Sequence, residues 1–305
     1  MPYASDPSGL LRLLPPIRRA RFWRLYAEDG SRFLDLWSDC SRSVLGAKGT
    51  GLGTQAKAAV DMGLTRAFPS VWEARLEKAL LAAYPGWAFA RFYSSDEAAL
   101  AALGRVSVPP LGGPLGGPLG AGARANIALA DPGRRGAGGA FGAGGAFEAG
   151  GGSGAAKVVA VLRPFAQALP PPPIGALAAL PLLPCPVALA PSALLFRDEE
   201  AALAAGGELL PPLLLACATR ALAELARFSA EYREESWRRA DRRLSPRFER
   251  LGPWLYPRCA EAEYEAFFRS ALSSGILLSP SWDLPSLLPG DFDDGELAAL
   301  ARALA

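Results

Sequence analysis

The candidate chemistry of this chain centres on Ser94, Ser95 and Asp96, which lie between an aromatic segment and an alanine-rich one. In residues 88–93 the side chains alternate with a period of two, which favours a strand. From Glu97 onward the composition favours a helix, and Ser and Asp commonly start one. A strand that enters a helix through such a turn directs free backbone N–H groups and the positive end of the helix dipole at one point, which suits a phosphate. An ordinary helix cap has the same pattern.

Composition excludes several kinds of catalytic chemistry. The 305 residues contain no histidine, which excludes Ser-His-Asp and Cys-His nucleophile systems and all imidazole acid–base catalysis. The cysteines are far apart and form no Cys-x-x-Cys pair, so we expect buried thiols in a reducing cytoplasm and no metal site. They are Cys40, Cys185, Cys217 and Cys259.

Charge and hydropathy exclude two classes of partner. The net charge is only +2, which indicates neither a nucleic-acid partner nor an acidic substrate. The N-terminus lacks the layout of a signal peptide. The uncharged run of residues 180–196 is interrupted by four prolines, at positions 181, 184, 186 and 191. Because proline breaks a spanning helix, we expect no membrane segment and a cytoplasmic protein.

The elements around the Ser94 turn are predicted from local signals. Residues 24–39 indicate a hairpin with its turn at 28–31. Ser70 to Glu73 form a capping box, with Ser70 accepting from the Glu73 N–H, and Pro85-Gly86 end the helix that follows. Residues 157–164 are rich in β-branched side chains and indicate a strand. Residues 194–199 are an apolar run that ends in charged residues, a pattern that is also common at a surface turn.

The rest of the chain divides into a low-complexity tract and a helical half. Residues 109–155 contain tandem Gly-rich units, whose chain entropy predicts disorder or a surface loop. A long helix is expected over 213–244 after Pro211 and Pro212. A further helix over 261–274 ends at Gly275, a short strand follows at 276–281, and a helix capped by Asp293 runs to the end.

The order of these features resembles that of the class III aminotransferases, which are fold-type I pyridoxal-phosphate (PLP) enzymes. The phosphate turn of that family reads Ser-Gly-Thr-Glu-Ala, and residues 94–98 here read Ser-Ser-Asp-Glu-Ala. The family opens with a hairpin that carries an Asp-Gly turn, which residues 28–35 resemble. Its small domain ends in a helix, a Gly, a Pro-Ser pair and a capped last helix, as residues 247–305 do here. The matched parts, 24–104 and 247–305, are under half of the chain.

The resemblance implies an α/β, fold-type I PLP-transferase-like protein. Its large-domain sheet, flanked by helices, is truncated, and a small α+β C-terminal domain follows. The expected division is an N-terminal arm and hairpin, the first part of the large domain, a low-complexity insert, the remainder of the large domain with a linking helix, and the small domain. The corresponding ranges are 1–45, 46–108, 109–155, 156–243 and 244–305.

The resemblance also implies a site and a partner. Ser94, Ser95 and Asp96 match the cofactor-phosphate turn. Residues 194–199 resemble the strand of the family that ends in Asp-Glu, so Asp198 matches the aspartate that holds the pyridine nitrogen. The active sites of the family form at a dimer interface, so a homodimer or a heterodimer with an intact paralogue is implied.

The chain departs from the family pattern at the residues that carry the chemistry. Asp96 stands where the family has threonine, and its carboxylate would be repelled from a phosphate by several kcal/mol at about 5 Å. The dipole of one helix offsets only about 0.3–1 kcal/mol of this repulsion, so Asp96 is expected to cap the helix instead. The Schiff-base lysine should follow the Asp-Glu strand, yet no lysine follows Lys157, which is expected to face solvent. No catalytic residue is therefore predicted.

Three hypotheses remain open from the sequence. The first is a degenerate aminotransferase-like protein without transaminase activity, with a structural or regulatory role. The second is a working PLP enzyme whose lysine lies at an unrecognised position. The third is an open reading frame that decays without selection.

Overall fold

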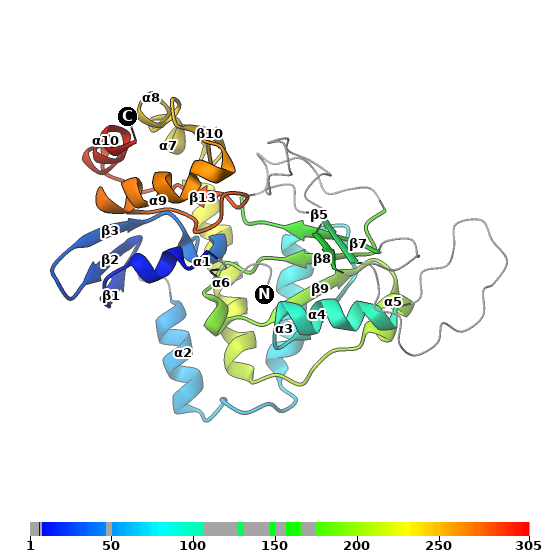
Figure 1. Ribbon diagram of the computed structural model, residues 1–305. Coiled ribbons are helices and arrows are strands. Elements are labelled where there is room, and N and C mark those ends of the chain that lie inside the picture. Colours follow the sequence, from blue (N-terminus) through cyan, green and yellow to red (C-terminus); the bar gives the residue numbers. More distant parts are fainter. Residues whose placement is uncertain are drawn as a thin grey trace.

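A central six-stranded sheet organises the larger part of the molecule (Figure 1). The computed structural model describes residues 6, 8–46, 51–106, 127–130, 147–149, 157–165 and 175–304. Within the sheet β7 is parallel to β5 and β8, whereas β9 is antiparallel to β4 and β8, and β6 is antiparallel to β5. In spatial order the strands are β4 (Phe89–Tyr93), β9 (Ser192–Phe196), β8 (Ala178–Pro181), β7 (Lys157–Leu162), β5 (Ile127–Ala130) and β6 (Phe147–Ala149).

Helices cover both faces of this sheet. On one face α3 (Val71–Ala83) and α6 (Pro212–Glu231) pack against Ala90, Ala160 and Leu195. On the other face α4 (Asp96–Ala102) and α5 (Glu199–Ala205) pack against Val159, Leu194 and Phe196. A strand buried on both faces needs an unbroken apolar run, which explains the composition of residues 193–196.

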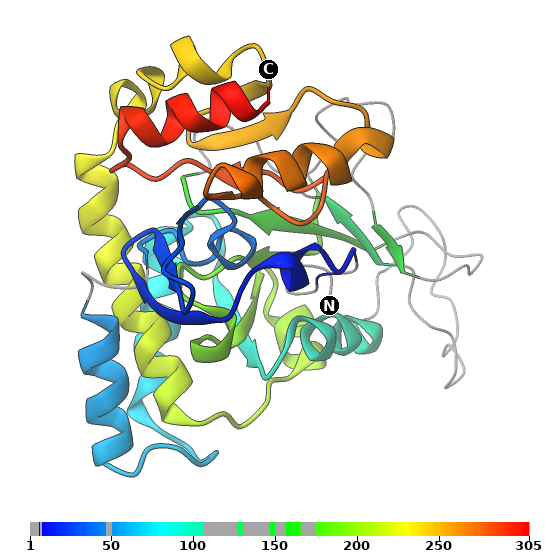
Figure 2. The same ribbon diagram turned by 60° about the vertical axis from the view of Figure 1, so that its left-hand side comes forward.

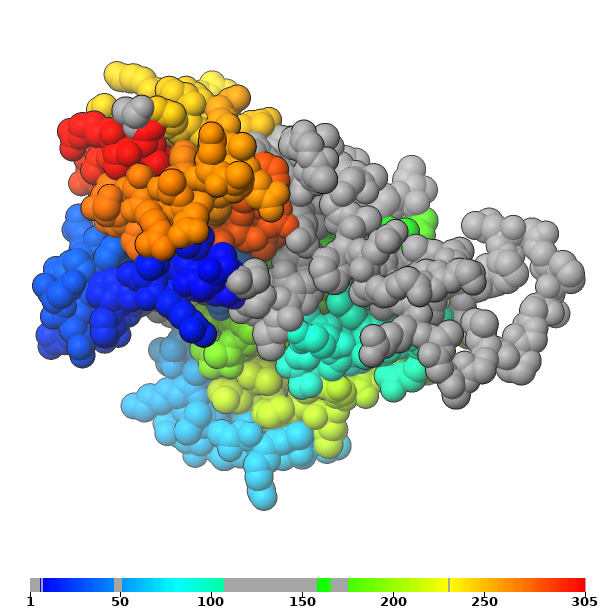
Figure 3. All heavy atoms as spheres, viewed as in Figure 1, coloured from blue at the N-terminus to red at the C-terminus, as the bar shows by residue number. Residues whose placement is uncertain are grey.

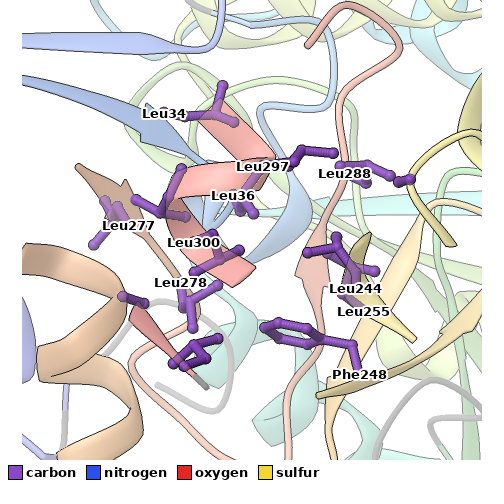
Figure 4. Close-up of a cluster of buried hydrophobic side chains, with 14 of the residues drawn as sticks. Leu34, Leu36, Leu244, Phe248, Leu255, Leu277, Leu278, Leu288, Leu297 and Leu300 are labelled. Carbon is purple, nitrogen blue, oxygen red and sulfur yellow. The ribbon is translucent and has the colours of Figure 1, made fainter. Parts of the chain in front are cut away.

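The two ends of the chain share a second sheet and one core. In this sheet β1 (Ile17–Arg21), β2 (Arg24–Ala27) and β3 (Arg32–Asp35) are antiparallel, and β12 (Ile276–Leu277) adds in parallel to β3. The N-terminal segment therefore lies against the C-terminal one, as Figures 2 and 3 show. The core combines Leu34 and Leu36 with Leu277, Leu300 and Phe248 (Figure 4).

Short elements complete the C-terminal part. β10 (Phe248–Leu251) and β11 (Trp254–Pro257) form a hairpin, to which β13 (Ser286–Leu287) adds. The helices around it are α7 (Glu234–Arg238), α8 (Asp241–Leu244), α9 (Tyr264–Ser273) and α10 (Asp294–Ala303). Elsewhere the structure has α1 (Ser38–Ser41), α2 (Leu52–Asp61) and 3-10 helices at Leu10–Leu13, Leu103–Arg105, Val187–Leu189 and Glu261–Glu263.

Several local predictions are confirmed. The predicted hairpin is the β2–β3 pair, and Gly275 has a φ of 81° after α9. Asp293 and Glu296 form the capping box of α10. Ser70 caps α3, although its hydroxyl accepts from the N–H of Trp72 at 3.3 Å and not from that of Glu73.

Other predictions were wrong, mostly where proline or glycine punctuates apolar segments. The helix expected over 213–244 ends at Glu231 and is followed by α7 and α8. β1, β8 and the β10–β11 hairpin were not predicted, because their short runs carry weak alternation. In the 109–155 tract β5 and β6 are strands, since β5 pairs with β7; the rest of that tract lies outside the described residues. The five-segment division stays a prediction.

Among the described helices, none combines the length and apolar character that a membrane crossing requires.

Candidate functional site

The turn between β4 and α4 is a fully formed helix cap. The Ser95 hydroxyl accepts a hydrogen bond from the N–H of Ala98 at 3.2 Å, which makes Ser95 the N-cap. Asp96 is the first helical residue, so the expectation that Asp96 caps the helix was wrong. The N–H of Ser94 donates to Oε2 of Glu208 at 2.6 Å. Two N–H groups at this turn, those of Ser94 and Ala98, are therefore already bonded to side chains of this chain.

Asp96 lies in a buried polar cluster. Nη2 of Arg42 is 2.7 Å from Oδ2 of Asp96, and the two side chains are only 3% and 8% exposed. The Ser192 hydroxyl donates to the other carboxylate oxygen, Oδ1. Charge-assisted bonds of this kind are about twice as strong as neutral ones. The carboxylate thus joins α4 to the start of β9 and to the segment that carries Arg42; we call Arg42, Asp96 and Ser192 the Asp96 cluster.

A left-handed turn carries the chain to Arg42. Four consecutive residues of α1 have positive φ angles of 49°, 51°, 57° and 66°, from Ser38 to Ser41. Each such non-glycine residue costs roughly 1–2 kcal/mol. Asp35 holds the start of the turn by accepting from the N–H groups of Trp37 and Ser38 at 3.0 and 2.8 Å. Asp39 accepts from the N–H of Val187 at 2.8 Å. Strain that neighbouring groups enforce in this way gathers at functional sites.

Burial changes the acidity of two groups in this turn. It raises the pKa of Asp35 to about 6, and the charge of Asp39 adds to the rise, although the bonds from Ser38 and Trp37 oppose it. Burial likewise raises the pKa of the Cys40 thiol to about 11. The thiol is therefore protonated at neutral pH and is a poor nucleophile. All four cysteines are free, and Cys40, Cys185 and Cys217 are buried.

Asp198, the fourth predicted cofactor residue, lies apart from the Asp96 cluster. Its carboxylate is exposed and caps α5 by accepting from the N–H of Ala201 at 2.7 Å. In the β4–β9 pair Ser192 lies opposite Tyr93, whereas Phe196 lies opposite Phe89 at the far end. Asp198 is thus at least about 13 Å along the sheet from the Ser94 turn. The structure joins Asp96 to Arg42 and Ser192, which no local signal indicated, and does not bring Asp198 to them.

The lysines of the chain lie away from this cluster where the structure describes their side chains. Lys57 on α2 and Lys78 on α3 are exposed. Lys157 opens β7, and Lys48 lies outside the described residues. The residues around Asp96 do not fit an aldehyde cofactor with a phosphate group. A buried carboxylate with its own arginine stands at the turn, and no described amine side chain reaches it.

Comparison of the sequence with other proteins gives relatives without a stated function. No protein-family model matches the chain. An uncharacterized protein of Treponema pallidum is 28% identical over 293 residues, which cover 92% of this chain and 91% of that protein. An uncharacterized protein of Borreliella burgdorferi is 41% identical over 64 residues, or 21% of this chain and 24% of that one.

Solved structures establish the fold. A transaminase with PLP bound superposes with a TM-score of 0.63 at 15% identity and covers 98% of this chain and 96% of its own. An omega-transaminase from Sphaerobacter thermophilus gives 0.60 at 13% identity, covering 99% and 97%. The Sphingopyxis FumI protein, in its PLP internal aldimine form, gives 0.64 at 15% identity, covering 99% and 90%. This chain has the fold of PLP-dependent transaminases.

Proposed function

We propose that this chain keeps the transaminase fold as a divergent, class III-like protein that does not carry out transamination. The observation that carries the proposal is the buried ion pair between Asp96 and Arg42 at the turn that resembles a phosphate site. A protein carboxylate occupies the position and takes up the positive charge that a cofactor phosphate would need.

The energetics of the ion pair support this proposal. A phosphate brings about −1.5 to −2 charges and would be repelled by the Asp96 carboxylate. Drawing Arg42 toward the phosphate would leave Asp96 buried without its counter-ion, which costs about 3–5 kcal/mol. Removing Asp96 from the site would also break its bond from Ser192. Tight binding of a phosphate at this turn is therefore opposed by the packing around it.

The distribution of amines points in the same direction. Transamination on such a fold requires a lysine that condenses with the aldehyde and moves the proton. Lys57 and Lys78 are exposed on helices, and no lysine follows Lys157. The part of the chain after the Asp-Glu strand, where the sequence resemblance places the lysine, thus carries no lysine.

A structural or regulatory role, as a homodimer or with an intact paralogue in the cytoplasm, completes the proposal. Within α2 only Ala59 is buried. Val60, Met62 and Val71, at the C-terminal end of α2 and the N-terminal end of α3, are 52%, 60% and 65% exposed, which suits a protein interface. Light scattering of the wild type against a Val60→Glu/Met62→Glu variant tests this role, and a monomeric wild type together with failure to bind a co-expressed paralogue would remove it.

Titration with PLP tests the absence of transaminase chemistry. We expect no aldimine absorbance band, and borohydride reduction followed by peptide mass spectrometry should give only sparse labelling. Variants in which Lys57 and Lys78 are changed to arginine control for adducts on exposed lysines. Stoichiometric labelling of Lys48 or Lys157 that survives in this double variant would overturn the proposal and establish the working enzyme. A single cooperative unfolding transition of the same sample argues for a maintained core and against a decaying reading frame.

A further inference from the structure

A cavity of about 340 Å³ lies between the C-terminal end of α6, α7 and the turn of the β10–β11 hairpin. None of its lining residues belongs to the Asp96 cluster. The volume is within the range of small-molecule sites, about 300–1,000 Å³. Its lining combines the rings of Phe165, Tyr232 and Trp237 with polar and charged groups that include Ser229, Arg233 and Glu234. We call this space the aromatic cavity.

Aromatic contacts fix the walls of the cavity. The rings of Phe165 and Trp237 meet edge to face, with centroids 5.8 Å apart and an interplanar angle of 70°. Tyr232 stacks on Phe228 at 5.8 Å and meets Trp23 edge-on at 6.4 Å. A Cβ atom at position 290 would lie 1.8 Å from Cε1 of Tyr232, so only the glycine there permits this ring position. The walls are therefore rigid before any ligand binds, which lowers the entropy cost of binding.

Phe165, which lines the cavity, has a strained backbone conformation. Its φ is 56°, in the left-handed region, which is a genuine outlier for a bulky residue. Residues held in such conformations gather at ligand clamps and active sites. The strained residue here carries one of the rings that line the cavity. A strained residue whose side chain also lines the cavity indicates that the cavity is a binding site.

The charged residues of the lining are Arg233 and Glu234. Glu234 pairs with Arg250 at 2.7 Å, and Arg250 also pairs with Asp241. Arg233 is exposed and is thus the charged lining residue that forms no ion pair with a described residue. Burial raises the pKa of Tyr232, and the charges of Asp291 and Glu231 raise it further. The Tyr232 hydroxyl therefore stays protonated at neutral pH, and it donates no hydrogen bond to another described group.

We propose that the aromatic cavity binds a small aromatic carboxylate. The ring of the ligand lies against Phe165 and Trp237, and its carboxylate accepts from the Tyr232 hydroxyl and the Arg233 guanidinium. Aromatic contacts supply apolar burial with offset or edge geometry, and arginine binds a carboxylate through two N–H groups. This site requires neither a phosphate nor an aldehyde, and it stands whether or not the protein transaminates.

Three naphthalene compounds test the proposal by calorimetric titration of the full chain. They are naphthalene-2-acetate, its neutral amide and the cationic 2-(naphthalen-2-yl)ethylamine. We expect the acid to bind about 5- to 20-fold more tightly than the amide, because charge-assisted bonds exceed neutral ones, and the amine to bind most weakly. Equal binding of all three, preferential binding of the amine, or no binding of the acid at millimolar concentration overturns the proposal.

Two variants locate the binding. Arg233→Ala should reduce affinity for the acid to that of the amide and leave the amide unchanged, whereas Arg238→Ala, which removes an exposed arginine of α7, should change neither. Ser229→Phe should fill the cavity and abolish both. Its control is Ser273→Phe, since each serine hydroxyl donates to a helix carbonyl three residues earlier. Acid binding that Ser229→Phe leaves intact overturns the location, and circular dichroism of each variant confirms that it folds.

Discussion

The Asp96 cluster and the aromatic cavity each contain an arginine, but the two arginines differ in burial and in ion pairing. Arg42 is buried and neutralised by Asp96, and Ser192 completes the shell of the carboxylate. Arg233 is exposed beside about 340 Å³ of space lined by rings. The first arrangement uses its charges to hold this chain together, and the second leaves a charge for something else. We therefore propose that the motif that resembles a ligand site is a structural joint, and that the capacity to bind lies in a region that carries no motif.

The largest effect should come from breaking the joint. Arg42→Met leaves Asp96 buried without a counter-ion, and we expect unfolding to become easier by about 3–5 kcal/mol in a denaturant titration. Arg269→Ala is the matched control, because its ion pair with Glu265 has side chains that are 53% and 64% exposed. Exposed pairs contribute at most about 1 kcal/mol.

The double variant Arg42→Met/Asp96→Leu sharpens this comparison. Replacing both charges with apolar groups removes the unpaired carboxylate, so the double variant should be more stable than Arg42→Met alone. A single variant as stable as the wild type would show that the ion pair is not the joint inferred from its burial.

An intermediate effect is expected from Asp35, which supports the approach to Arg42. Its folded pKa of about 6 exceeds the ordinary value of 3.8, so the folded state binds the proton more tightly. Stability should therefore fall as pH rises from about 4 to 6, and the loss should be complete at pH 7. Asp35→Asn keeps an acceptor for the N–H groups of Trp37 and Ser38 and should gain about 1–3 kcal/mol at pH 7, since solvent screening reduces the full shift for this half-buried group.

Measurements over a range of pH can also contradict this prediction for Asp35. The gain of Asp35→Asn over the wild type should disappear below pH 3.8, where both side chains are neutral. A difference that is the same at every pH would assign the effect to packing and not to the carboxylate charge. Chemical denaturation at several pH values measures both.

The sequence predicted what is encoded locally. Ser70 and Asp293 cap their helices, and β4 is the strand that alternation indicated, because caps and periodicity involve residues within a few positions of each other. The Arg42–Asp96 pair spans 54 positions, and β3 pairs with β12 near the opposite end of the chain. Such pairings depend on register and topology, which local propensity does not determine. Phe165 and the residues Ser38–Ser41 have left-handed backbones although none of them is a glycine, so the sequence gives no signal for this conformation.

The smallest effect should come from relieving one step of the left-handed turn. Ser41 has a φ of 66°, and its buried hydroxyl has no hydrogen-bond partner among the described residues. Ser41→Gly removes both the steric cost and the unpaired hydroxyl, and we expect a gain of about 1 kcal/mol in the free energy of unfolding. Ser43→Gly is the control; its φ is not positive, so glycine there should only add chain entropy and destabilise by about 0.5–1 kcal/mol. If Ser41→Gly destabilises the protein as Ser43→Gly does, contacts of the Ser41 side chain contribute more to stability than its left-handed backbone costs. The aromatic cavity should be indifferent to either change, since its lining includes no residue of this turn.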